Sequence, residues 1–172
     1  MAWRIVIMGV SGCGKSSVGA AVAADQRLPL VEGDDFHGAA NRDKMARGIA
    51  LNDDDRAQWL ATLGGQLAAH PQGVVLACSA LKRAYRDVLR KAAPGLRFVF
   101  LDLPIAEAKR RVAHRGGHFF SPSLVESQFA TLEPPLEEEG VLRVDATEPI
   151  AEITREVARW LRPSLDPGSS PG

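Results

Sequence analysis

The stretch Gly9-Val10-Ser11-Gly12-Cys13-Gly14-Lys15-Ser16 decides the fold of this chain. It follows the apolar run Ile5-Val6-Ile7-Met8 and precedes an Ala- and Val-rich segment, so we expect a strand, a glycine-rich loop and a helix in that order. The spacing G-x-x-x-x-G-K-S is that of the phosphate-binding P-loop. Glycines let successive backbone N–H groups turn inward around phosphate oxygens, at a helix N-terminus whose dipole favours an anion. The stretch therefore predicts a binding site for the phosphates of a nucleoside triphosphate.

Three side chains of this loop have separate expected roles. Lys15 places a positive charge on the β- and γ-phosphates and is a candidate catalytic residue. Ser16 offers its hydroxyl to the Mg²⁺ that accompanies the nucleotide. Cys13 would be sensitive to oxidation if the helix N-terminus stabilised its thiolate. The predicted nucleotide contacts are Gly9, Val10, Ser11, Gly12, Cys13, Gly14, Lys15, Ser16 and Ser17.

Length and composition limit the class of protein. The chain of 172 residues has the size of one domain, and its 21 Lys and Arg residues balance 21 Asp and Glu residues. Zero net charge without a basic tract gives no indication of nucleic acid or a membrane surface as the main partner. Two cysteines are too few for a disulfide framework, and no long apolar stretch marks a signal peptide or a membrane span. We expect a cytoplasmic protein.

Apolar runs alternate with helical patterns, which predicts βαβ units and an α/β fold with a parallel sheet covered by helices. The two most apolar runs, residues 5–8 and 74–77, lack alternation and are expected to be central strands. Residues 1–162 are expected to form one domain, and the Pro-, Ser- and Gly-rich residues 163–172 a disordered tail. Strands are predicted at residues 4–8, 28–31, 74–78, 98–101 and 141–144.

Candidate acceptor-site residues follow the second predicted strand, since ligands bind beyond the carboxyl ends of parallel strands. Asp34 comes directly after Gly33 and is the candidate base that takes the proton of a substrate hydroxyl. An ordinary turn or a helix N-cap is the alternative for Asp34. His37, about one turn further on, either binds the substrate or is a structural hydrogen-bonding residue.

A second group of candidates lies between the second and third predicted strands. A short helix is predicted from Asn41, its N-cap, to Gly48, which lies just beyond its end. The acidic run 53–55 is expected in the first turn of the next helix, where negative charge suits the helix dipole. Arg56 lies one turn before a Trp-Leu pair and is a candidate for binding a carboxylate at the edge of a pocket, with a surface position as the alternative.

The third predicted strand ends at Cys78, where many P-loop proteins carry a metal-binding carboxylate. Because Cys78 and Ser79 stand at this position, we expect the metal to be held by Ser16, nucleotide phosphates and water, with Asp34 as a further candidate ligand. Ser79 is a plausible N-cap for the next helix. Lys82 in that helix either reaches a substrate oxygen or lies on the helix surface.

Residues 114–132 are expected to form a mobile lid. A helix predicted from about Ile105 carries Arg111 and Arg115 on one face and is broken by Gly116-Gly117. The glycine pair gives hinge freedom, so the lid can bring an arginine, Arg115, onto the transferring phosphoryl group. A solvated basic helix is the alternative.

Beyond the P-loop, several blocks of residues carry a resemblance to a known family. These are Gly33-Asp34, His37, Asn41, Lys44-Met45, Gly48, Leu51-Asn52-Asp53-Asp54-Asp55-Arg56, Trp59-Leu60, Cys78-Ser79-Ala80-Leu81-Lys82, Tyr85-Arg86, Gly117-His118-Phe119 and Gln128-Phe129. Over about residues 4–162 the chain closely resembles the bacterial-type gluconokinases. The resemblance implies ATP-dependent phosphorylation of D-gluconate at its 6-hydroxyl. It also implies a three-layer P-loop fold like that of nucleoside monophosphate kinases, with a five-stranded parallel sheet, a mobile lid and commonly a homodimer.

The resemblance gives roles to the acceptor-site candidates. It implies that Asp34 contacts the attacking hydroxyl, that Lys44 and Arg56 lie in the gluconate region, and that Lys82 lies close to the substrate or the phosphates. Together with His37, these residues are the predicted substrate-binding set.

On the donor side, the resemblance implies ATP with Mg²⁺. In related small-molecule kinases the arginine at the position of Arg111 lies against adenine, and the lid arginine, here Arg115, meets phosphate. Asp145-Ala146-Thr147 resembles the loop that contacts adenine in the same fold.

Two alternative functions remain open from the residues. Another small-molecule P-loop kinase, of shikimate or nucleotide type, would need a different substrate block, and residues 41–60 argue against it. A GTPase-type switch would carry an N-K-x-D sequence and a D-x-x-G after the third strand, and the sequence contains neither.

Overall fold

Five parallel strands form one sheet in the order β2-β3-β1-β4-β5. The computed structural model describes residues 3–115 and 122–162. The order places β1 in the middle with β3 beside it, which confirms that the two most apolar runs are central strands. All five predicted strands occur, with ends shifted by at most about two residues. They are β1 (Arg4–Met8), β2 (Leu30–Glu32), β3 (Val74–Ala77), β4 (Arg97–Asp102) and β5 (Val141–Asp145).

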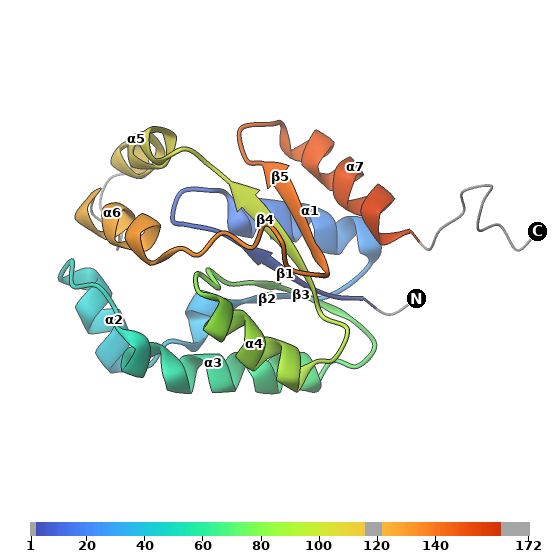
Figure 1. The fold of residues 1–172 in the computed structure, drawn as a ribbon, viewed down its shortest axis with the longest axis horizontal. Coiled ribbons are helices and arrows are strands. Elements are labelled where there is room, and N and C mark those ends of the chain that lie inside the picture. The colour runs from blue at the N-terminus through green and yellow to red at the C-terminus, as the bar shows by residue number, and fades with distance from the viewer. Residues whose placement is uncertain (1–2, 116–121, 163–172) are drawn as a thin grey trace, which may run out of the picture.

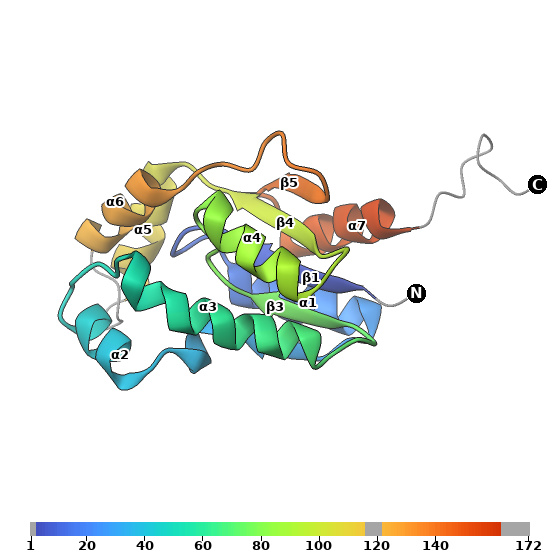
Figure 2. The same cartoon turned by 60° about the horizontal axis from the view of Figure 1, so that its bottom comes forward.

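Two pairs of helices cover the sheet, one pair on each face, which gives the three layers expected of the fold (Figure 1). On one face α1 (Lys15–Gln26) packs against α7 (Ile150–Leu161). On the other, α3 (Asp53–Ala68) packs against α4 (Arg83–Ala92), and Figure 2 shows this pair in front of the strands. Among the described residues, no helix is both long and apolar enough to span a membrane.

The remaining helices gather at the edge where the parallel strands end (Figure 1). Parallel pairing directs the carboxyl ends of all strands to that edge, so each segment that follows a strand begins there. The helices at this edge are η1 (Gly33–Phe36), α2 (Ala39–Ala46), α5 (Ile105–Arg115) and α6 (Pro122–Thr131).

Two of the expected helix caps are wrong. Helix α2 begins at Ala39, so Asn41 lies in its first turn and is buried instead of capping it. Helix α4 begins at Arg83, because the chain after β3 stays irregular and passes through Ala80 at a φ of 46°. Gly48 follows α2 at a φ of 73°, as expected for a residue just beyond a helix end.

A buried arginine fixes two loops beside the sheet edge. Arg86 is fully buried in α4 and pairs with Glu138 through two hydrogen bonds. It also donates to the backbone carbonyls of Ala80, Leu81 and Glu133. Breaking a buried, multiply bonded ion pair of this kind costs about 3–5 kcal/mol. The loop after β3 and the segment after α6 are therefore held as one unit.

Candidate active site

The P-loop joins β1 to α1 as the sequence predicts. Gly14 is the N-cap of α1 at a φ of 92°, a left-handed conformation that suits glycine because a β-carbon would be strained there. Lys15 donates from Nζ to the carbonyl oxygens of Gly9 and Val10, at 3.0 and 3.2 Å. The Lys15 ammonium is thus held against the first residues of the P-loop.

Glu32, the last residue of β2, is a site residue that the sequence analysis missed. The Ser16 hydroxyl donates to Glu32 Oε1 at 2.8 Å, so this carboxylate orients the side chain expected to bind the metal. The signal was present, since Glu32 stands two residues before Asp34 at a strand end that was already a candidate for ligand binding.

Asp34 is carried by a backbone segment that is held from two sides. A β-carbon on Gly33 would lie 2.6 Å from the Ala77 carbonyl oxygen, so glycine lets η1 turn directly across the end of β3. Trp59 donates from its indole nitrogen to the Gly33 carbonyl at 2.7 Å. The Asp34 side chain itself is 71% exposed, so a carboxylate accessible to ligands projects from a firmly placed backbone.

A cavity at this edge joins the P-loop to the segments that follow β2 and to α6. Its walls include residues of both the predicted phosphate site and the predicted acceptor site. Its lining residues are Ser11, Lys15, Asp34, His37, Met45, Ile49, Ala50, Leu51, Arg56, Trp59, Ser79, Leu124, Ser127 and Gln128.

Arg56 is a buried cation in the wall of this cavity, with only 8% of its surface exposed. Its Nη1 donates to the Leu51 carbonyl at 2.8 Å and to the Tyr85 hydroxyl at 3.3 Å. The surface position that spacing left open is thereby excluded. A guanidinium fixed in this way can bind a carboxylate without first losing much side-chain freedom.

Lys44 and Lys82 lie outside the cavity lining and are paired with aspartates of the acidic run. Lys44 contacts both carboxylate oxygens of Asp55 at 2.9 and 2.8 Å, and Lys82 contacts Asp53 at 3.0 and 3.3 Å. Tyr85 also donates its hydroxyl to Asp53. Contact between these two lysines and the substrate stays a prediction, and in this structure each ammonium is paired with a carboxylate.

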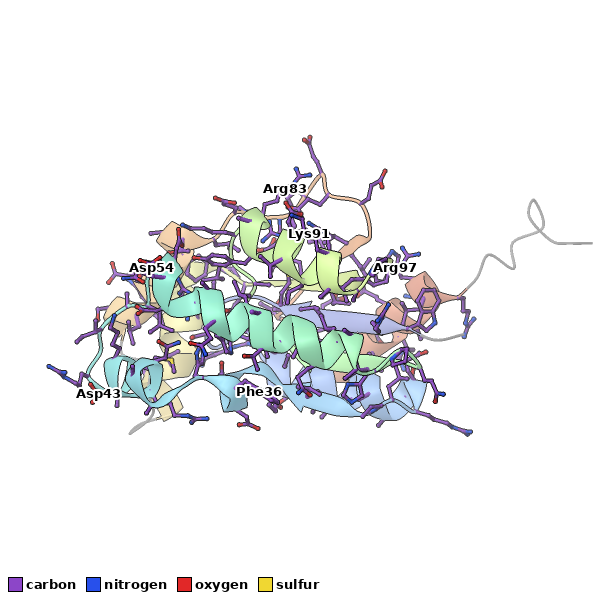
Figure 3. The ribbon with its side chains drawn as sticks, turned by 90° about the horizontal axis from the view of Figure 1, so that it is seen from below. Phe36, Asp43, Asp54, Arg83, Lys91 and Arg97 are labelled. Atoms are coloured by element: carbon purple, nitrogen blue, oxygen red, sulfur yellow. The ribbon has the colours of Figure 1, made fainter. Side chains whose placement is uncertain are left out.

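The acidic run therefore does more than begin α3. Asn52 and Asp55 form a reciprocal capping box at the start of the helix, as expected of a negatively charged first turn. Hydrogen bonds from Lys44 and from the Asn52 backbone lower the pKa of Asp55, and those from Tyr85 and Lys82 lower the pKa of Asp53. Asp54 is exposed at the N-terminal end of α3, where its negative charge suits the helix dipole as expected (Figure 3).

His37 is buried in the cavity wall and contacts three residues. Its ring stacks on Trp59, with the centroids 4.2 Å apart and the planes 16° from parallel. Its Nδ1 lies 3.1 Å from Asn41 Nδ2, and its Nε2 lies 3.8 Å from Asp34 Oδ1. Burial lowers the pKa of the imidazole. The structure thus brings His37 to the cavity beside Asp34. Its position fits substrate binding, and its contact with Asn41 fits a structural hydrogen-bonding role.

Gln128 connects α6 to the P-loop. Its side-chain oxygen accepts a hydrogen bond of 2.6 Å from the backbone N–H of Ser11, and the residue is 9% exposed. The two residues are 117 positions apart, so no local pattern in the sequence pointed to this contact. It closes one side of the acceptor cavity.

A second pocket lies on the other flank of the P-loop. Arg111 crosses it, with Nη1 donating to the Gly12 carbonyl at 3.1 Å and Nη2 to the Ala146 carbonyl at 3.2 Å. The predicted adenine-side residues are therefore brought together with the P-loop. The lining residues are Gly12, Cys13, Gly14, Ser17, Val18, Arg110, Arg111, Ala146, Glu148, Ile150 and Ile153.

The surroundings of Cys13 disfavour the thiolate that was a hypothesis from the sequence. Cys13 is only 2% exposed, and burial raises the pKa of its thiol above the ordinary value, although Lys15 acts in the opposite direction. Gly116-Gly117 and the side chain of Arg115, which belong to the predicted lid, lie outside the described residues, as does the predicted tail 163–172.

A parallel sheet with a P-loop, and beside it a cavity bearing an accessible carboxylate, defines a P-loop kinase of small molecules. A family model described as an AAA domain matches residues 5–135. The gluconokinase of Gluconobacter oxydans (strain 621H) is 42% identical over 160 residues, which cover 90% of this chain and 89% of that protein. The thermosensitive gluconokinase of Escherichia coli (strain K12) is 40% identical over 155 residues, which cover 88% and 83%.

A solved structure agrees with these relatives. The crystal structure of a gluconokinase from Sinorhizobium meliloti 1021 has 50% sequence identity and a TM-score of 0.85, and the match covers 92% of this chain and 93% of that one. The chain belongs to the gluconokinase family.

Proposed function

We propose that this protein transfers the γ-phosphoryl group of ATP to the 6-hydroxyl of D-gluconate, giving 6-phosphogluconate and ADP. One observation carries the proposal: Lys15 of the P-loop, the accessible carboxylate of Asp34 and the buried guanidinium of Arg56 line the same cavity. These are the groups that a phosphoryl donor, an alcohol and a carboxylate substrate each require.

In the proposed reaction, Asp34 takes the proton of the 6-hydroxyl as its oxygen attacks the γ-phosphorus. The bond between the γ-phosphorus and the β,γ-bridging oxygen breaks, and its electron pair leaves with ADP. The proton on Asp34 then passes to solvent, to which this side chain is open. Lys15 supplies positive charge where the transferring phosphoryl oxygens lie. Arg115 is proposed to add a second positive charge there, and Arg111 to line the adenine side.

The residues at the P-loop fit a Mg²⁺ ion that is shared with the nucleotide. Ser16 supplies a hydroxyl ligand whose orientation Glu32 sets, and the described residues contain no group of three or more His, Cys, Asp or Glu that would hold a metal by themselves. When bound, the ion would neutralise phosphate charge that develops during transfer. Glu32 thus takes the place of the carboxylate expected, and missing, at the end of the third strand.

Arg56 is the proposed partner of the gluconate carboxylate. Lys44 and Lys82 are proposed to act through the aspartates they bind, since Asp53 and Asp55 shortly precede Arg56 in the first turn of α3. The homodimer implied by the family resemblance is also a proposal, which light scattering of the purified protein tests by its molar mass.

A coupled assay of ADP release tests the function. Gluconate, shikimate and nucleoside monophosphates are compared as acceptors at the same ATP and Mg²⁺ concentrations, and the product is identified by mass spectrometry. We expect turnover with gluconate and only background rates with the other two classes. Turnover with shikimate or a nucleotide, and none with gluconate, would overturn the assignment in favour of another small-molecule kinase, which the 40–50% identical relatives disfavour.

A further inference from the structure

The orientation of the Asn41 amide fixes the protonation of His37. Asn41 Nδ2 lies 2.8 Å from the backbone carbonyl oxygen of Asp55. A carbonyl oxygen can only accept, so the Asn41 atom in this place must be the donor nitrogen, and its second hydrogen faces His37 Nδ1 at 3.1 Å. Nδ1 must therefore accept. The imidazole is then neutral and carries its single proton on Nε2.

The other contacts of His37 hold the ring in this one orientation. Stacking on Trp59 sets the plane of the ring, and Trp59 is itself fixed by its bond to the Gly33 carbonyl. A doubly protonated ring would direct an Nδ1 proton at the donor protons of Asn41, which is unfavourable. The charged groups that face the ring are Asp34 from η1, Arg42 from α2 and Arg56 from α3, and burial together with the two arginines outweighs Asp34 in lowering the pKa.

Nε2–H therefore points toward Asp34 without bonding to it closely. The separation of 3.8 Å is too long for a hydrogen bond. It is also less than twice a normal hydrogen-bond length of about 2.8 Å, so a single oxygen atom can lie within reach of both groups. A hydroxyl is the group that fits: its oxygen accepts from Nε2–H while its proton is donated to the carboxylate.

We propose that His37 and Asp34 bind the reacting hydroxyl together, with His37 as the hydrogen-bond donor to its oxygen, and that Asn41 is the positioning residue that keeps the donor proton on Nε2. This inference rests on the proposed function and adds to it how the acceptor oxygen is aligned. The His37 N–H also discriminates among acceptor substrates. A substrate without an oxygen at this point leaves the buried N–H without a partner and therefore binds more weakly.

Replacing His37 tests the donor. His37→Phe keeps a ring to stack on Trp59 but removes the N–H, and His37→Gln keeps an N–H donor of similar reach. We expect His37→Phe to lower kcat/KM for gluconate by about 10- to 100-fold, with His37→Gln clearly less affected and the KM for ATP unchanged in both. Equal activity of His37→Phe and the parent protein overturns the proposal.

Replacing Asn41 tests the tautomer. In Asn41→Asp a carboxylate accepts from Nδ1–H, so the neutral ring presents a bare Nε2, and only the imidazolium regains a donor there. The new carboxylate should raise the pKa of His37 in this variant, so its kcat/KM should rise as the pH is lowered and the ring becomes charged. Asn41→Leu should lose activity without that rise. A parallel pH dependence in the two variants refutes the role of Asn41, since both lose the bond to Asp55 equally.

Nitrogen NMR of histidine-labelled protein gives a readout that needs no activity. The His37 signals, assigned by their absence in His37→Gln, should report Nε2–H and a bare Nδ1 at neutral pH, and an Nδ1–H tautomer would sink the proposal. Failure of the parent protein to phosphorylate gluconate, by contrast, counts against the proposed function and leaves the NMR result standing.

Discussion

The donor half and the acceptor half of this site are built in different ways. The P-loop is held largely by contacts within itself: Gly14 turns the chain, and the Lys15 side chain bonds to carbonyls five and six residues before it. Gln128 and Arg111 each add one bond to it from outside. The acceptor half is held by side chains from different elements, such as Trp59 of α3 on the Gly33 carbonyl and Asn41 of α2 on the Asp55 carbonyl. A short motif is therefore enough to define the donor half, whereas the acceptor half needs the whole fold.

This difference teaches where substrate choice resides. A loop built from backbone N–H groups binds phosphate in any nucleotide, so it carries little information about the acceptor. The cavity wall built by long-range side-chain contacts can change residue by residue while the P-loop stays intact. Substitutions in the two halves should then separate cleanly into effects on phosphoryl transfer and effects on gluconate binding.

The largest expected effect comes from the donor half. Lys15→Ala should lower kcat by roughly 10³- to 10⁴-fold, because the ammonium stabilises charge that develops mainly in the transition state. The gluconate KM should stay within a few-fold of the parent value in steady-state assays. A kcat close to that of the parent protein would mean that the P-loop lysine is not part of the reaction.

Asp34→Asn should lower kcat by roughly 10²- to 10³-fold, since the amide cannot take the hydroxyl proton. Binding of a non-hydrolysable ATP analogue, measured by calorimetry, should be unchanged because Asp34 belongs to the acceptor half. Loss of nucleotide affinity of the same size would erase the proposed division between the halves.

Arg56→Met should raise the gluconate KM by roughly 10- to 100-fold, as expected for losing a charge-assisted pair with a carboxylate. Methionine keeps much of the buried side-chain volume. Arg47→Met, at the exposed residue that follows α2, removes the same charge from the surface and serves as the matched control. Similar KM changes in both variants would show that only net charge matters.

Glu32→Gln should raise the Mg²⁺ concentration for half-maximal activity by about tenfold, the effect typical of losing a partner that orients a metal ligand. Glutamine preserves size and a hydrogen bond to Ser16 but removes the negative charge. Saturating Mg²⁺ should restore most of the parent kcat. A deficit that Mg²⁺ does not restore would show that Glu32 acts on something other than the metal.

The smallest effect concerns stability and pH. Burial keeps the pKa of folded His37 below the ordinary value of about 6.5, so on acidification the unfolded chain takes up a proton before the folded chain does. The free energy of unfolding from urea titrations should therefore fall from pH 7.5 to 5.5, by at most about 1.4 kcal/mol per pH unit for this group. In His37→Gln the fall should be shallower. The lowered pKa values of Asp53 and Asp55 act at lower pH and are common to both proteins.

The same contrast explains what could be predicted from sequence. The strands followed from buried apolar runs, and the P-loop from its spacing, because both signals are local. Asn41 was expected to cap a helix because the residue type favours caps, but it is buried behind the cavity wall by its contacts with His37 and with Asp55. Residue spacing alone cannot distinguish a helix-capping asparagine from a buried one, because the partners of Asn41 are brought to it only by the fold.

The two lysines show a different limit. The family resemblance implied that Lys44 lies in the gluconate region and that Lys82 lies close to the substrate or the phosphates. The structure supplies the anions internally, as Asp55 and Asp53. The sequence shows which residues are charged but not which of them form ion pairs. It therefore cannot distinguish a lysine that is free to bind a ligand from one that is paired with an aspartate. Arg56 differs because its neighbours, Leu51 and Tyr85, are uncharged acceptors.

The buried thiol of Cys13 offers a way to measure how often the P-loop opens. Cys13 and Cys78 are both free and buried, and burial raises the pKa of Cys78 to about 12. A thiol reagent can reach Cys13 only while the loop is open, so the rate of its labelling, followed by peptide mass spectrometry, measures how often the loop opens. We expect bound nucleotide to slow that opening, so that the labelling rate of Cys13 would report nucleotide binding.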